Sequence, residues 1–163
     1  MLKRVKAVLN NSKYKNYLDK INNLEKNREF CCHDIHHFVS TARLAYLFSL
    51  KSKVNLPKDV IYAAGLLHDI GRFKQYEEEK DHALAGAELA ESILKESGFT
   101  FKEREMICTA IKEHRLKEGK SLSTPLSKFL WKGDKYSRLC FSCKAKEICN
   151  KFEEMPHNSF LFF

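Results

Sequence analysis

The most apolar stretch of this 163-residue chain ends in Ala63-Ala64-Gly65-Leu66-Leu67-His68-Asp69-Ile70-Gly71. It belongs to a segment, residues 57–69, that is apolar on nearly every side, and Pro57 suits the first turn of a helix. We therefore expect a buried central helix. A carboxylate at the buried end of such a helix is costly unless a metal ion, a cation or several hydrogen-bond donors accompany it. The pair His68-Asp69 is thus the first candidate functional site.

The rest of the chain is predicted to be helical as well. Its 6 Gly and 3 Pro are too few for a turn-rich β-protein. A chain of this length favours one domain with one core, so the expected fold class is all-α, a helical bundle. A polar loop is expected over residues 117–124. Apolar spacing and capping residues predict helices over residues 3–9, 12–26, 35–51, 57–69, 82–96, 101–115 and 125–138.

Histidine and aspartate recur on the apolar faces of several predicted helices. His37, His114 and Asp134 each continue an apolar stripe, whereas His36 lies on a more polar face of its helix. His82 begins its helix beside the expected cap. Taken singly, each histidine is better explained as a hydrogen-bonded core residue. Taken together with the central His-Asp pair, they indicate convergence on a metal, because helical bundles build metal sites from imidazoles and carboxylates on facing helices.

In chain order, these residues resemble the HD-domain superfamily of metal-dependent phosphohydrolases. The resemblance covers about residues 30–140, and its ordered spacing is specific. One departure is His37-Phe38-Val39-Ser40-Thr41, which lacks the arginine of the family's HxxRV; of His33, His36 and His37, we favour His37 as the ligand. The motifs are the HDxxH opening His33-Asp34-Ile35-His36-His37, the core Leu66-Leu67-His68-Asp69-Ile70-Gly71, the HxxxGA segment His82-Ala83-Leu84-Ala85-Gly86-Ala87, the helix Ala110-Ile111-Lys112-Glu113-His114, and the closing Gly133-Asp134-Lys135.

The resemblance implies an HD-domain helical bundle over residues 30–140. Basic helices over residues 1–29 are expected to pack on it, and a Cys-containing C-terminal extension over residues 141–163 to follow it. His82 and His114 would bind a second ion that Asp69 bridges, or, with one ion, would hold phosphate or protonate the leaving group. Mn, Fe, Mg, Co and Zn are all candidate metals, and Fe or Mn suits a site this rich in His and carboxylate. The resemblance assigns one divalent metal ion to His37, His68, Asp69 and Asp134.

The reaction that the resemblance implies is hydrolysis of a nucleotide or related phosphate mono- or diester by a metal-activated water. Asp69, His82 and His114 are then the catalytic candidates. Arg72 follows the HDIG turn and Lys135 follows the last ligand, so both are expected to bind the substrate phosphate. Two other classes stay open: a di-iron oxygenase of the same fold, and a non-catalytic nucleotide- or RNA-binding sensor of metal or redox state.

The charge of the chain favours a small anionic partner. The formal net charge is +8, and the excess lies mainly in residues 1–29 and 128–151. There is no arginine-rich run and no interleaving of aromatic and basic residues, so nucleic acid is possible but not favoured. Without a long apolar span or a signal peptide, a cytoplasmic protein with no membrane segment is expected. The final Phe160-Leu161-Phe162-Phe163 is expected to pack on the domain.

The six cysteines are expected to be reduced thiols or metal ligands rather than disulfides. Either Cys31 or Cys32 could supply a fourth ligand to three C-terminal cysteines and complete a structural zinc site or an iron–sulfur cluster. The alternative is a set of partly buried free thiols. Cys108, in the middle of a predicted helix, is expected to be an ordinary core residue. The C-terminal cysteines form a C-x2-C-x5-C arrangement of Cys140, Cys143 and Cys149.

Overall fold

The computed structural model describes residues 2–116 and 121–159. Its described residues contain no strand, which confirms the all-α prediction. Three short 3₁₀ turns follow the last α-helix, at Cys140–Ser142, Lys146–Ile148 and Phe152–Glu154. The α-helices are α1 (Lys3–Asn10), α2 (Ser12–Leu24), α3 (Ile35–Lys51), α4 (Lys58–Leu67), α5 (Arg72–Glu78), α6 (His82–Glu96), α7 (Phe101–Glu113) and α8 (Pro125–Tyr136).

Seven of these helices lie where their capping residues and apolar spacing predict them. The side chain of Asp81 caps α6, and Thr100 with Glu103 forms the capping box expected at the start of α7. Helix α5 was not predicted from the sequence. It follows Gly71 without a side-chain cap and buries only Phe73, so it has neither of the signals by which a helix is predicted.

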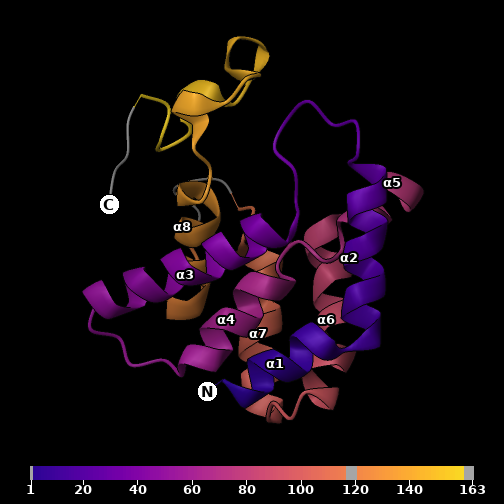
Figure 1. Ribbon diagram of the computed structural model, residues 1–163. Coiled ribbons are helices and arrows are strands. Elements are labelled where there is room, and N and C mark those ends of the chain that lie inside the picture. Colours follow the sequence, from indigo (N-terminus) through magenta and orange to yellow (C-terminus); the bar gives the residue numbers. More distant parts are fainter. Residues whose placement is uncertain (1, 117–120, 160–163) are drawn as a thin grey trace.

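Helix α4 is the central helix, as predicted. Its last eight residues are buried with one exception, Tyr62, and it contacts α3, α7 and α8. Helix α3 packs on α4 and α8, and α6 packs on α7 (Figure 1). The core therefore surrounds the end of α4 from which His68-Asp69 emerges.

The first two helices pack on the side of this core. Val5 and Val8 of α1 are buried, and α1 contacts α4 and α6. Arg4 donates hydrogen bonds to Asp59 on α4 and to Glu103 on α7. Helix α2 packs against α5. The basic N-terminal helices therefore pack directly on the helical bundle.

The segment after α8 stands apart from the bundle (Figure 1). Among the described residues, Leu130 is the last one in the chain that belongs to the buried apolar core. The segment is tied back by a ring contact between Tyr136 and His157 and by a backbone hydrogen bond from Phe141 to His157. The C-terminal residues 160–163, which were expected to pack on the domain, and loop residues 117–120 lie outside the described residues. No helix in the described chain is long and apolar enough to cross a membrane.

Candidate metal centre

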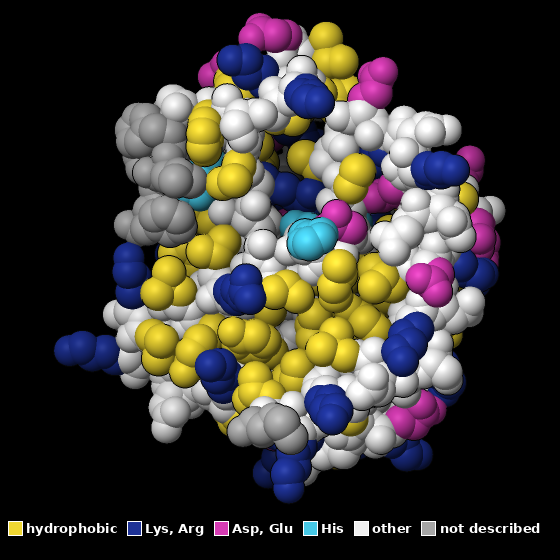
Figure 2. Space-filling model, viewed as in Figure 1, with side chains coloured by type: hydrophobic (Ala, Val, Ile, Leu, Met, Phe, Trp, Pro, Cys, Tyr) yellow, Lys and Arg dark blue, Asp and Glu magenta, His cyan; other side chains and the backbone are white. Residues whose placement is uncertain are grey.

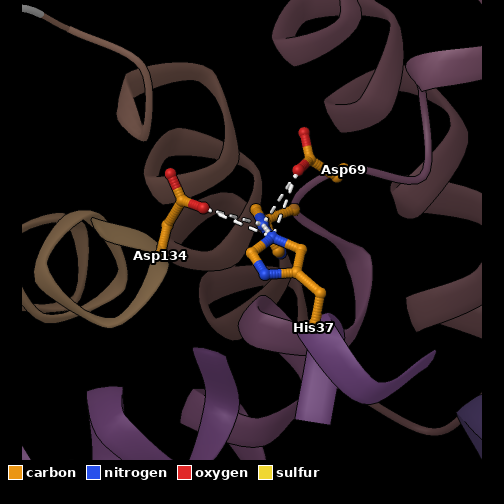
Figure 3. A group of neighbouring side chains, drawn as sticks. His37, Asp69 and Asp134 are labelled. Carbon is orange, nitrogen blue, oxygen red and sulfur yellow. Dashed lines mark hydrogen bonds and ion pairs between the residues drawn. The ribbon is translucent and has the colours of Figure 1, made fainter. Parts of the chain in front are cut away.

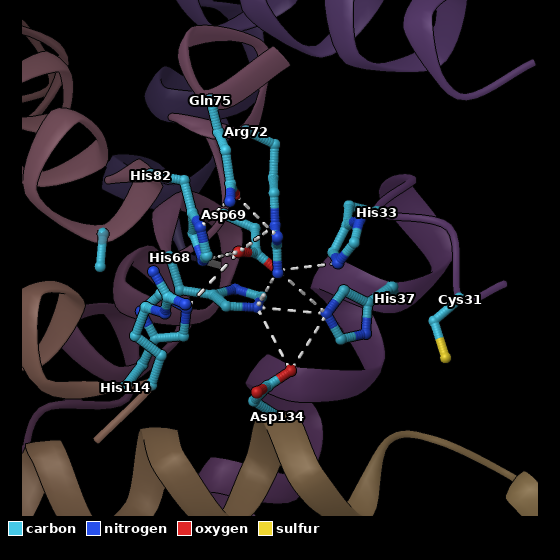
Figure 4. A network of polar contacts seen from close by, with 12 residues as sticks. Cys31, His33, His37, His68, Asp69, Arg72, Gln75, His82, His114 and Asp134 are labelled. Atoms are coloured by element: carbon cyan, nitrogen blue, oxygen red, sulfur yellow. Dashed lines mark hydrogen bonds and ion pairs between the residues drawn. The ribbon is translucent and has the colours of Figure 1, made fainter. Parts of the chain in front are cut away.

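Side chains from five helices and the turn after α4 meet at one buried point (Figure 4). Asp69, in the turn after α4, is at its centre and is 1% exposed. The contributing residues are His37 from α3, His68 from the end of α4, His82 from α6, His114 from the end of α7, and Asp134 from α8.

Asp69 and three of these residues, His37, His68 and Asp134, form a first group. Nε2 of His37 lies 3.2 Å from Nε2 of His68 and 3.3 Å from Oδ1 of Asp134. Oδ2 of Asp69 lies 3.2 Å from Nε2 of His68 and 3.6 Å from Nε2 of His37 (Figure 3). Their ligand atoms all lie within 4.8 Å of one another, so this group could hold a metal ion.

A second group shares Asp69 through its other oxygen. Oδ1 of Asp69 lies 3.2 Å from Nε2 of His82 and 3.4 Å from Nε2 of His114. These three ligand atoms also lie within 4.8 Å of one another. Asp69 therefore stands between two groups of potential ligands, which is the arrangement of a carboxylate that bridges two ions.

The two histidines at helix ends are oriented by the backbone. Nδ1 of His68 donates to the carbonyl oxygen of Gly65 at 2.8 Å, and Nδ1 of His114 donates to that of Ile111 at 2.6 Å. A carbonyl oxygen only accepts, so Nδ1 carries the proton in each case. Each Nε2 then faces the carboxylates, and this outer hydrogen bond is typical of metal-binding histidines.

Side chains orient two further histidines in the same way. Nδ1 of His82 donates to Oε1 of Gln75 at 2.7 Å, and Nδ1 of His37 lies 3.0 Å from Oγ of Ser137. The Ser137 hydroxyl already donates to the carbonyl of Asp134, so it accepts from His37. Nε2 of His82 is buried and makes no hydrogen bond, because the proton of this ring is on Nδ1. A buried, unsatisfied nitrogen aimed at a carboxylate fits a metal ligand.

His33 is a fifth histidine directed at Asp69, and it was only one of three alternatives in the sequence. Its Nε2 lies 3.7 Å from Oδ2 of Asp69, while its Nδ1 donates to the buried carboxylate of Glu25 at 2.5 Å. His36, by contrast, is exposed. The structure therefore directs both His33 and His37 toward the centre and His36 away from it.

The electrostatics favour ionised carboxylates at this centre. Burial alone would raise the pKa of Asp69, but Arg72 and the imidazoles hold it well below its ordinary value. Burial would likewise raise the pKa of Asp134, yet the nearby imidazoles of His37 and His68 hold it well below its ordinary range. Burial lowers the pKa of His82 to about 4, so that imidazole is neutral near pH 7. Burial would lower the pKa of His68, but Asp69 and Asp134 raise it to about 9, so this imidazole must lose a proton to bind a metal. Ionised carboxylates and neutral imidazoles are the forms that bind metals.

Glycine at position 71 is required by the close approach of two chain segments. A Cβ atom there would lie 2.3 Å from the carbonyl oxygen of His82 and 2.4 Å from the backbone nitrogen of Gly86. The turn after α4 can therefore lie directly on α6, which brings Asp69 to His82. This is the physical reason for the Gly in the His-Asp-Ile-Gly motif.

A cavity of about 420 Å³ opens beside the centre and is lined by both Asp134 and His33. The two cations expected to bind phosphate, Arg72 and Lys135, both line it. Nε of Arg72 donates to Oδ1 of Asp69 at 3.1 Å, which joins the cavity to the centre. Basic side chains are visible in the hollow of Figure 2. The other cations that line the cavity are Arg28, Arg138 and Lys151.

Three residues that orient the histidines were not predicted from the sequence: Glu25, Gln75 and Ser137. Glu25 follows the end of α2 and is buried by contacts that form only in the folded chain, including a hydrogen bond from Tyr76. Gln75 lies on the unpredicted helix α5. Ser137, next to the Asp134 helix, had no periodic signal of its own.

Comparison with known protein families agrees with this geometry. Residues 34–148 match the family model of the HD domain. The chain therefore belongs to the HD-domain superfamily of metal-dependent phosphohydrolases, as its motifs predicted. HD domains bind divalent metal ions, and the His/Asp centre described above could hold such ions.

Two related proteins extend this comparison. An uncharacterized protein of Clostridium beijerinckii is 35% identical over 151 residues, which cover 93% of this chain and 94% of that protein. Ribonuclease Y of Lawsonia intracellularis is 36% identical over 86 residues. That match covers 53% of this chain but only 15% of the ribonuclease. No solved structure matches the chain.

Proposed function

We propose that this protein hydrolyses a phosphate ester, with a nucleotide or related mono- or diester as its substrate. The observation that carries the proposal is the shared carboxylate of Asp69, which faces imidazole nitrogens through both of its oxygens. A cavity lined by five cations lies directly beside it. A metal centre next to a cationic cavity is the arrangement that phosphoryl chemistry needs, because the reacting group is anionic.

The residues fit two divalent ions. His37, His68, Asp69 and Asp134 would hold one of them. His82 and His114 would hold the second, with Asp69 between the two. When bound, such ions lower the pKa of a coordinated water and offset the charge on the phosphoryl group. Fe or Mn suits this mixture of imidazole and carboxylate ligands.

The residues around the centre would then orient and bind the substrate. Gln75 and Ser137 fix the tautomers of His82 and His37, so that the Nε2 lone pairs face the carboxylates. Arg72 and Lys135 would bind the phosphate oxygens from the cavity wall. If only one ion binds, His82 and His114 would instead hold phosphate or protonate the leaving group.

The cavity sets the class of substrate. Its volume of about 420 Å³ lies within the range of small-molecule sites, so a nucleotide fits the proposal better than a long polymer. One related protein is a ribonuclease, and an RNA phosphodiester should therefore be included among the substrates tested.

The test begins with metal analysis of freshly purified protein, followed by a screen of nucleotides, phosphomonoesters, aryl phosphodiesters and short RNA with the best metal. Metal-dependent release of phosphate or of the aryl group supports the proposal. Fully metal-loaded protein that cleaves none of these compounds contradicts it. Tight nucleotide binding without turnover would instead indicate a sensor, and oxygen consumption by a mixed-valent iron centre would indicate an oxygenase.

A further inference from the structure

Four of the six cysteines gather around a second cavity, which also reaches His37 of the His/Asp centre. The cavity has a volume of about 290 Å³ and lies between the segment after α8, the loop before α3 and the first turns of α3. All six cysteines are free thiols. In Figure 4 the sulfur of Cys31 points away from the His/Asp centre. The cysteines that line the cavity are Cys31, Cys140, Cys143 and Cys149.

A series of tight backbone turns arranges the three C-terminal cysteines. The backbone nitrogen of Cys143 donates to the carbonyl of Cys140 at 3.0 Å, and that of Cys149 donates to the carbonyl of Lys146 at 3.3 Å. These turns return the chain to the same cavity twice. The segment thereby brings three thiols together without any helix or strand of its own beyond short 3₁₀ turns.

The fourth thiol comes from more than a hundred residues earlier in the chain. Arg138, just before the cysteine turns, donates to the carbonyl of Cys32 at 3.0 Å, and Arg28 donates to the carbonyl of Cys31. The bond from Arg138 holds the loop before α3 against the start of the cysteine segment, and the bond from Arg28 lies within that loop. Cys31 lines the cavity as a result, whereas Cys32 is exposed and directs its thiol to the carbonyl of Phe30.

The thiols are close enough to influence one another. Burial, together with the three neighbouring thiols, raises the pKa of Cys140 to about 11. The side chains of Phe30, Leu139 and Phe152 form the apolar part of the cavity wall. The other residues that line it are His36, His37, Ser40, Ser137, Arg138 and Lys146. Four cysteines around one cavity are a donor set that binds soft metals as thiolates.

The four thiols are not gathered as closely as a single zinc ion requires. Four thiolates on one zinc ion lie about 3.8 Å apart, since Zn–S bonds of about 2.3 Å point to the corners of a tetrahedron. In the described chain, the ligand atoms that gather within 4.8 Å of one another are the two His/Asp groups, and neither includes a cysteine. The cysteines instead surround a cavity, which suits a larger centre.

We propose that Cys31, Cys140, Cys143 and Cys149 bind an iron–sulfur cluster that joins the C-terminal segment to the loop before α3. Three of these cysteines also line the cationic cavity beside Asp134. The cluster therefore fixes one wall of that cavity and keeps its cations in place. The proposal does not depend on the hydrolase activity, because the four thiols are distinct from the His/Asp ligands.

The experiment is to purify the full-length protein without oxygen and to measure iron, zinc, acid-labile sulfide and visible absorption. Sulfide separates this centre from iron in the His/Asp groups, which contain no inorganic sulfur. We expect about four sulfides per chain, as in a four-cysteine [4Fe–4S] centre, and a broad visible band that dithionite bleaches. Protein without sulfide, or with zinc in its place, would overturn the proposal.

Adjacent cysteines supply a matched control. Cys31→Ser and Cys143→Ser should lose the sulfide and the visible band, whereas Cys32→Ser and Cys108→Ser should keep both. Cys108 is suited to this role because it packs on the helical core and donates to the carbonyl of Ala87. Circular dichroism establishes that each variant is folded. Loss of the band in Cys32→Ser but not in Cys31→Ser would contradict the ligand assignment.

Discussion

The helical bundle and the cysteine segment are held together by different means. In the bundle, the ligands of the His/Asp centre project from packed helices whose apolar faces are buried. In the described part of the cysteine segment, by contrast, Cys140, Ala145 and His157 are the buried residues. A core that forms without metal can orient ligands in advance. A segment with so little buried apolar surface needs another source of stability, which the proposed cluster would supply.

The largest expected effect is on the bridging carboxylate. Asp69→Asn keeps the shape of the buried side chain but removes the charge that both groups of ligands share. We expect activity to fall on the order of 10³-fold and metal content to fall at both groups, while the helical circular dichroism signal stays. Activity assays and metal analysis check this prediction.

Two variants make that test specific. Asp134→Asn removes a ligand of the first group only and should leave the ion between Asp69, His82 and His114. Asp19→Asn, an exposed substitution on α2, should change neither activity nor metal content. If Asp69→Asn retained both ions, the proposed bridge would be wrong.

Arg72→Ala tests the cationic cavity that lies between the helical bundle and the cysteine segment. This residue lines the cavity and donates to Asp69. Removing a charged hydrogen-bond donor to phosphate should raise KM about ten- to a hundredfold, with a smaller change in metal content. Steady-state kinetics and metal analysis are compared with those of the exposed Arg43→Ala. A metal loss as large as that of Asp69→Asn would mean that Arg72 holds the centre rather than the substrate.

The helix packing that positions Asp134 is tested at Gly133. A Cβ atom there would lie 2.6 Å from the carbonyl oxygen of Thr41 on α3, so Gly133→Ala must push α8 away. We expect a loss of about 1–3 kcal/mol in the free energy of unfolding, and weaker metal binding because Asp134 moves with α8. Gly86→Ala is the matched control, since its Cβ would be 3.4 Å or more from its neighbours. A similar loss of stability in both variants would show that the close approach of Gly133 to α3 is not what makes Gly133→Ala destabilising.

The sequence predicted the parts of the fold that local signals determine. His68 and Asp69 stand in one continuous motif at the end of an apolar helix, so both were found. The Thr100 capping box and the Asp81 cap were found for the same reason: each depends on residues three or fewer positions apart.

Residues whose role depends on distant contacts were not predicted. Glu25 orients His33 only because the folded chain buries its carboxylate beside that ring. The choice between Cys31 and Cys32 also stayed open, because the loop before α3 has no periodicity that would assign either thiol to a face. In the structure, Arg138 and Arg28 bind the backbone of that loop, and Cys31 is the one that lines the cavity.

Metal removal should separate the two regions directly. Chelation under anaerobic conditions removes the cluster as well as the His/Asp ions, and we expect the helices of the core to keep their hydrogen-exchange protection. Amides in residues 140–155 should exchange at least about tenfold faster, which corresponds to about 1.4 kcal/mol of local stability. Uniform loss of protection along the chain would show that the bundle also depends on its metals, and the contrast drawn above would fail.

The smallest expected effect lies in the bundle itself, where α1 is held by charge. A hydrogen bond from Arg4 lowers the pKa of Glu103 from 4.5 to about 2. Because the pKa is lowered in the folded state, this pair stabilises the protein above about pH 4.5 and is lost as the pH falls through about 2. Glu103→Gln can still cap α7 but cannot form the ion pair. We expect it to cost about 1 kcal/mol near pH 7 and less near pH 3.

Urea unfolding of the wild type and of Glu103→Gln at the two pH values measures this difference. Any loss of metal at low pH affects both proteins equally and cancels in the comparison. Metal content and sulfide should be unchanged, because Arg4 and Glu103 belong to neither centre. A difference in stability that grew as the pH fell would have the wrong sign for a carboxylate whose pKa is lowered. A loss of sulfide would mean that the cysteine segment is sensitive to the packing of α1, which its separation from the core argues against.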